Sequence, residues 1–139
     1  MKRTTNEIQR RYMAAKALVD TLDEQRISME QDYIAAHGIT NQDGTIPERI
    51  YCIDDESVFD AANEGCSREI ESCGLENQYN DARDLLFSAE NAMIEYGLSL
   101  APSGVRATLE KGARNNYTTR QKIIELVLRL DTSTVEGTK

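Results

Sequence analysis

Apolar residues recur at alternating spacings of four and three along the first part of the chain. The stripe comprises Ile8, Tyr12, Ala15, Val19, Leu22, Arg26, Met29, Tyr33 and Ala36, and Arg26 is its one charged member. A heptad pattern of this kind predicts one long, coiled-coil-like helix over about residues 5–37. Thr4 and Glu7 match a capping box at its start, and His37-Gly38 predicts its end.

Residues 38–55 interrupt the helical pattern. Asn41, Gly44 and Pro47 are turn-forming residues, and the apolar run at 50–53 has the composition of one short extended strand. Because a single strand cannot make a sheet, the sequence predicts a connecting loop, either irregular or with a small hairpin.

Two central helices follow. The first is predicted over about residues 55–73, with an aspartate pair as its N-cap and Gly74 as its end. The second is predicted over about residues 77–96, ended by Gly97. Its apolar positions keep the three-four spacing: Tyr79, Ala82, Leu86, Ala89, Met93 and Tyr96.

The last third predicts a helical pair. Ser103 is a candidate cap for a short helix that ends near Arg114. Thr118 and Gln121 form a second capping-box pattern, which opens a final helix with a strongly apolar side.

These elements predict an all-α helical bundle. The chain has 139 residues, no Trp and two Phe, so its core must be built mainly from aliphatic side chains. We expect a single helical domain over residues 1–131 and a polar C-terminal tail over residues 132–139.

Charge is distributed unevenly. The net charge is −8, yet residues 48–95 carry −10 and residues 96–139 carry +3. The central carboxylates that define a candidate acidic face are Glu56, Asp60, Glu64, Glu71, Asp81 and Asp84. Such a face either keeps a helix soluble or recognises a basic protein surface, including the groove of a nucleic-acid-binding protein by mimicry of phosphates.

The basic C-terminal third offers an alternative function. Its two helices resemble a helix-turn-helix pair in outline, with cations near the junction at Arg106, Lys111, Arg114, Arg120 and Lys122. The second helix is mostly apolar after Lys122, and the whole chain is acidic. Direct nucleic-acid binding is therefore not favoured.

The long first helix offers a second alternative, a homo-oligomeric structural or ligand-binding protein. Tyr12, Val19, Arg26 and Tyr33 lie on one seam that a second copy or a partner would cover. Packing within one chain, with Arg26 at the edge of the bundle, explains the same pattern.

Candidate reactive residues are few. The spacing of Cys52, Cys66 and Cys73, together with the single histidine His37, does not match a zinc or di-iron site. Cys66 and Cys73 share a helical stripe with Phe59, Ala62 and Ile70, which predicts that both thiols are buried. His37 is predicted to be a surface or capping residue. We expect no metal, no cofactor and no enzymatic activity, because nucleophile and phosphate-loop motifs are also lacking.

The remaining features concern location and class. The N-terminal residues lack the apolar stretch of a signal peptide, and no segment is long and apolar enough to span a membrane. The number of cysteines is odd, three, so they cannot all pair in disulfides within one chain. These features predict a cytoplasmic protein with free thiols. We therefore expect an adaptor or inhibitor that acts by binding, a class that includes proteins encoded by phages and mobile elements.

Overall fold

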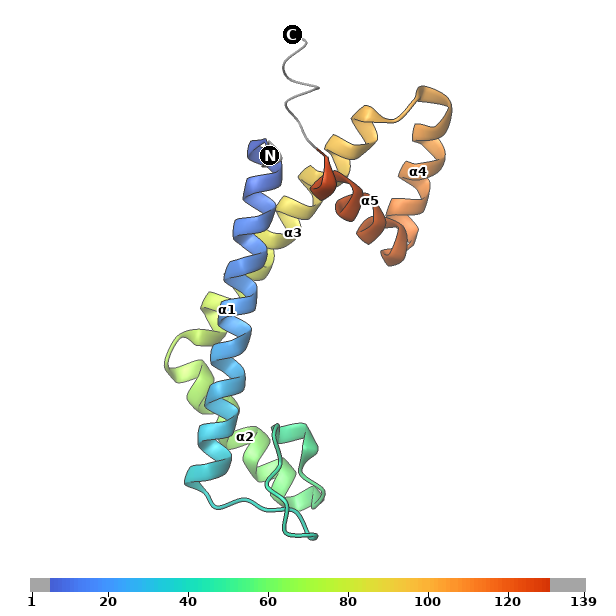
Figure 1. The fold of residues 1–139 in the computed structure, drawn as a ribbon. Helices are drawn as coiled ribbons and strands as arrows, with labels where there is room; N and C mark the ends of the chain where they lie inside the picture. The colour runs from blue at the N-terminus through green and yellow to red at the C-terminus, as the bar shows by residue number, and fades with distance from the viewer. Residues whose placement is uncertain (1–5, 131–139) are drawn as a thin grey trace. The chain divides into compact units, whose positions relative to one another are not determined.

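The computed structural model describes residues 6–130, which form five α-helices and contain no β-strand (Figure 1). Their bounds are α1 Glu7–Ala36, α2 Glu56–Ser72, α3 Leu75–Leu100, α4 Ser103–Asn115 and α5 Tyr117–Arg129. The predicted all-α class is confirmed. The predicted polar tail, residues 132–139, lies outside the described residues.

Helix α1 begins with a capping box two residues after the predicted one. The backbone N–H of Asn6 donates to Gln9 Oε1 at 2.7 Å, and the N–H of Gln9 donates to Asn6 Oδ1 at 2.9 Å. Thr4 lies outside the described residues, and the Glu7 carboxylate pairs with Arg11 instead. The helix ends as predicted, because Gly38 takes the left-handed conformation at φ +60°.

The segment between α1 and α2 contains no strand. The run predicted as extended forms a short 3₁₀ helix, η1 (Ile50–Cys52). Helix α2 begins at the predicted cap, since Asp55 accepts a hydrogen bond from the Val58 N–H at 3.1 Å. Gly74, at φ +82°, ends α2 as predicted.

The sequence predicted that the third helix ends at Gly97, but α3 continues to Leu100. A Cβ at position 97 would lie 2.8 Å from Ile123 Cγ2 and 2.9 Å from Val127 Cγ2. Gly97 therefore serves close packing between α3 and α5, and Pro102 follows the end of the helix.

The caps of the C-terminal helices differ from the prediction. Ser103 is the first residue of α4, and the N-cap Pro102 makes no side-chain capping hydrogen bond. Helix α5 is capped by Asn116, whose Oδ1 accepts from the N–H groups of Thr118 and Thr119 at 2.8 and 3.3 Å. Asn116 is also the single residue between the two helices, so the turn itself supplies the cap.

The chain divides into two compact units, each with its own buried residues. The central unit is Leu18–Ala82, and the terminal unit is Met1–Ala17 with Arg83–Lys139. In the terminal unit the core consists of Tyr12, Met93, Ile94, Ala113, Ile123, Ile124 and Val127. Buried apolar residues of the central unit are Val19, Leu22, Ile34, Ile50, Ile53, Ala62, Cys66, Ile70, Leu75 and Ala82. No feature of the sequence predicted this division.

Candidate functional site

The acidic face predicted on α2 lies at the surface of the central unit. Glu56, Asp60, Glu64 and Glu71 are all exposed, while Ala62, Cys66 and Ile70 of the same helix are buried. The helix therefore separates a carboxylate side from a core side.

The other two predicted residues of the acidic face are on α3. Asp81 and Asp84 are both exposed. Asp81 belongs to the central unit, whereas Asp84 belongs to the terminal unit. Asp81 thus adds to the charge of the unit that carries α2.

The central unit has a large excess of negative charge. It contains sixteen acidic and three basic residues, a net charge of −13, against +5 for the terminal unit. Each of its three arginines already pairs with a glutamate of the same unit. The pairs are Arg26–Glu76 at 3.7 Å, Arg49–Glu30 at 2.6 Å and Arg68–Glu64 at 3.4 Å. The excess therefore cannot be balanced by cations of that unit.

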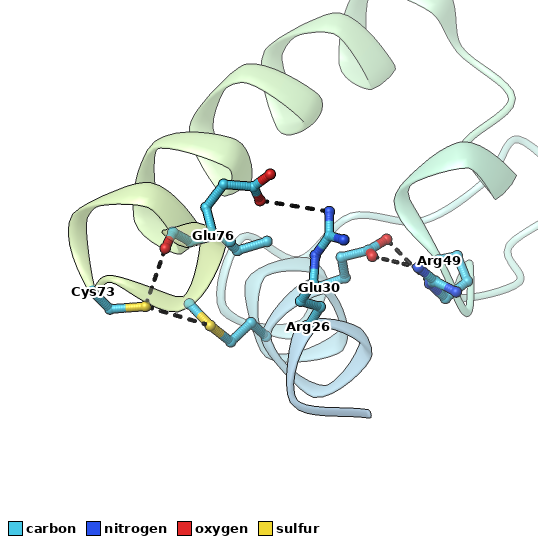
Figure 2. A network of polar contacts seen from close by, with 7 residues as sticks. Arg26, Glu30, Arg49, Cys73 and Glu76 are labelled. Carbon is cyan, nitrogen blue, oxygen red and sulfur yellow. Dashed lines mark hydrogen bonds and ion pairs between the residues drawn. The ribbon is translucent and has the colours of Figure 1, made fainter. Parts of the chain in front are cut away.

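Glu30 fastens the segment after α1 to that helix (Figure 2). Its Oε1 accepts from Arg49 Nε at 3.2 Å and from the Ile50 N–H at 3.0 Å, and its Oε2 accepts from Arg49 at 2.6 Å. Burial by itself would raise the pKa of Glu30. The hydrogen bonds from Arg49 and Ile50, with the positive charges of Arg49 and Arg26, lower that pKa overall. The carboxylate is thus held in its charged form.

The seam residues of α1 are covered or paired within the same chain. Tyr12 and Val19 are each only 8% exposed. The Arg26 guanidinium pairs with Glu76 and lies 4.5 Å from the ring centre of Tyr79. These contacts correspond to packing within one chain, the alternative that the heptad pattern left open.

Tyr33, the remaining seam residue, packs beside α2 at its glycine. A Cβ on Gly65 would collide with the Tyr33 hydroxyl. The Tyr33 ring stacks on His37 at 3.9 Å between centroids, and His37 Nδ1 lies 2.9 Å from the Tyr33 carbonyl oxygen. His37, the single histidine, is exposed and lies directly after the last residue of α1.

The prediction that both helical thiols are buried is right for one of them. Cys66 is 2% exposed, and burial, followed by the negative charges of Glu30 and Glu69, raises the pKa of its thiol. Cys73 is exposed, with Sγ 3.3 Å from the Ile70 carbonyl oxygen (Figure 2). The apolar stripe continues in the sequence, but α2 ends at Ser72, so the stripe no longer determines where Cys73 points.

The basic residues near the α4–α5 junction are largely engaged within the chain. Arg106 donates to the carbonyl oxygens of Ser99 and Ala101 at 3.3 and 3.1 Å. Arg114 pairs with Glu110, and Arg120 donates to Asn91 Oδ1 at 2.9 Å. The other two predicted cations, Lys111 and Lys122, are exposed.

Neither a metal centre nor a membrane-spanning helix is evident over residues 6–130. That part of the chain contains no group of three or more His, Cys, Asp or Glu that could hold a metal ion, and no helix long and apolar enough to cross a bilayer. No protein-family model matches the chain, and comparisons with curated proteins and with solved structures find no match either.

Proposed function

We propose that the protein is a non-enzymatic adaptor or inhibitor whose acidic central unit binds a basic surface of another protein. The observation that carries the proposal is the net charge of −13 on Leu18–Ala82, where all three arginines are already paired with glutamates. A charge of this size draws a cationic partner from solution and accelerates association.

The arrangement of carboxylates on α2 supports a specific surface rather than a diffuse charge. Glu56, Asp60 and Glu64 follow one another at intervals of four, so neighbouring side chains lie about 5–6 Å apart at Cβ. Like charges at this spacing destabilise a helix by a few tenths of a kcal/mol per pair. A cationic partner would relieve this repulsion on binding.

The same row of charges supports mimicry of a nucleic-acid backbone. Regularly spaced carboxylates can occupy a cationic groove that is built to hold phosphates, and a nucleic-acid-binding protein is then the partner. Direct binding of nucleic acid by this chain is not proposed, because the chain carries a net charge of −8 and the side chains of Arg106 and Arg120 donate to groups within the chain.

A cytoplasmic location is part of the proposal. It is supported by three free cysteines, of which Cys52 and Cys73 are exposed. Exposed thiols of this kind stay reduced in the cytosol.

The test compares two variants with the same change in net charge. The first neutralises α2 through Glu56→Gln, Asp60→Asn, Glu64→Gln and Glu71→Gln. The matched control neutralises four other exposed carboxylates of the central unit, through Asp23→Asn, Glu24→Gln, Asp32→Asn and Glu48→Gln. Each protein is immobilised, exposed to lysate of the source organism and washed at increasing salt, and bound proteins are quantified by mass spectrometry.

We expect the wild-type protein and the control variant to retain the same basic partner, and the α2 variant to lose it. Added double-stranded DNA should release the partner if the surface imitates phosphates. If both variants lost the partner equally, binding would depend on the total charge of the unit and not on α2. If both retained the partner equally, a role for α2 would be refuted. Circular dichroism of each variant verifies that helicity is unchanged.

A further inference from the structure

The terminal unit contains an apolar groove between the end of α3, α4 and α5. Its volume is about 230 Å³, and five of its lining residues are leucines: Leu98, Leu100, Leu109, Leu126 and Leu130. The buried side chains of Ile123 and Val127 also line it. Because Gly97 lets α5 pack closely against α3, the groove lies directly beside the core of the unit.

Two of the five groove leucines are exposed to solvent. Leu126 is 62% exposed and Leu100 is 42% exposed. A single exposed leucine needs no explanation, but two that line one concave apolar surface match the sites where amphipathic helices dock. Such helices place apolar anchors three and four residues apart into a groove of this kind.

The positive charge of the helices that form the groove favours a partner with acidic residues. Helices α4 and α5 together carry six basic and two acidic residues, a net charge of +4. Lys122 and Arg129 lie four residues before and three residues after Leu126, and are therefore its neighbours on the helix surface. Arg129 pairs with Glu125 at 3.2 Å, but both side chains are more than 60% exposed, so this pair can be exchanged for another carboxylate at little cost.

We propose that this groove binds an acidic amphipathic helix of a partner protein, with its apolar face on the groove leucines and its carboxylates on Lys122 and Arg129. The site is separate from the acidic face of α2, so it goes beyond the function proposed above and is tested independently of it. A protein with both surfaces would join a basic protein to one that presents an acidic helix.

The experiment uses the full chain and three labelled 18-residue peptides in fluorescence-anisotropy titrations. One peptide has leucines at helical three-four spacing and glutamates elsewhere. The second has lysine in place of each glutamate, and the third has the composition of the first with its leucine spacing scrambled. We expect the first to bind with a Kd of about 100 μM or tighter, and the other two to bind at least about tenfold more weakly.

Three variants locate the site. Leu126→Asp should weaken the acidic peptide at least about tenfold, as expected for loss of a central anchor. Lys122→Glu should weaken the acidic peptide and strengthen the lysine peptide. The matched control is Leu85→Asp, because Leu85 is a 59% exposed leucine of the same unit that does not line the groove. It should leave binding within about twofold of wild type, the effect typical of a peripheral position.

Several results would overturn the proposal. These are no binding of the acidic peptide, equal binding of the lysine or scrambled peptide, and unchanged binding by Leu126→Asp in a protein of normal helicity. Sedimentation of the chain alone supplies the last arm. Self-association that Leu126→Asp abolishes would assign the groove to a second copy instead of a partner's acidic helix.

Discussion

Gln9 offers the sharpest test of how the terminal unit is held together. Its side chain is fully buried on α1, and its Nε2 donates to the Val127 and Leu130 carbonyl oxygens at 2.7 and 3.0 Å. Its Oε1 accepts from the Asn6 N–H at 2.7 Å. One amide therefore caps the start of α1 and also satisfies carbonyl groups at the end of α5, where the helix leaves them without partners.

Gln9→Met keeps the length of the side chain and removes all three hydrogen bonds. A net contribution of about 1 kcal/mol per bond predicts a loss of roughly 3 kcal/mol in the free energy of unfolding. The Val127 carbonyl retains the Leu130 N–H at 3.1 Å, which limits the penalty for an unpaired acceptor. With a urea m-value of about 2 kcal/mol/M, the denaturation midpoint should fall by about 1.5 M.

Gln9→Glu separates the two roles of the amide. A carboxylate at position 9 can still accept from Asn6 but cannot donate to the carbonyl oxygens of α5. We therefore expect a larger loss than for Gln9→Met at pH 7, and partial recovery on acidification, because the protonated acid regains one donor. Its folded pKa would be raised, so this recovery appears as the pH falls through that raised value.

The assay is urea denaturation followed by circular dichroism, with Gln31→Met as the control at an exposed position of the same helix. The control should shift the midpoint by less than about 0.3 M, the scale of an ordinary surface substitution. If Gln9→Met behaved like the control, or if Gln9→Glu were the milder of the two, the buried hydrogen bonds of Gln9 could not be stabilising the unit.

Three further outcomes follow from particular contacts. The Glu30 carboxylate should stabilise the central unit above its ordinary pKa of 4.5, and this stabilisation should be lost as the pH falls through its lowered folded pKa. Glu30→Gln should therefore make hydrogen exchange in the central unit less sensitive to acid. An unchanged pH profile would refute this. In thermal unfolding, Gly97→Ala should destabilise the protein by roughly 1 kcal/mol, because its Cβ would overlap two side chains of α5. Gly104→Ala, with open space around it, should stabilise the protein by up to about 1 kcal/mol. The reverse order of stabilities would contradict the packing at Gly97. A thiol reagent should modify Cys73 in the native protein and Cys66 only after unfolding, and modification of both at one rate would show that their exposures do not differ.

Features that depend on a few neighbouring residues could be predicted from the sequence. Gly38 and Gly74 end their helices with positive φ, and Asp55 caps α2, because these positions are governed by local backbone chemistry. Cap patterns were less reliable where several polar residues competed. Asn6-x-x-Gln9 is as good a capping-box sequence as the Thr4 pattern, and Asn116 is as good a cap as Thr118. At the start of α1, the hydrogen bonds from Gln9 to the Val127 and Leu130 carbonyl oxygens favour the observed pattern, and these contacts cannot be read from the sequence.

Features that depend on contacts between helices could not be predicted in this way. Gly97 looks like a helix end until Ile123 and Val127 are placed beside it. Leu126 falls off the buried stripe of Ile123, Ile124 and Val127, so periodicity places it away from the core. Nothing in the sequence, however, marks its 62% exposed side chain as part of a groove. The groove likewise requires three helices to be placed, and none of its leucines is marked by a motif.

The proposed basic partner would act mainly on the uneven charge of the central unit. Sixteen carboxylates confined to Leu18–Ala82 repel one another, and the ion pairs of Arg26 and Arg49 are spent on positioning Glu76 and Glu30 inside that unit. A solubilising surface would be served as well by mixed charges, which avoid this repulsion. Charges of one sign raise the free energy of the isolated unit through mutual repulsion. A bound cationic surface would lower that free energy again. If it binds the proposed basic partner, such a unit would gain stability from it, as any protein does from a ligand that binds only its folded state.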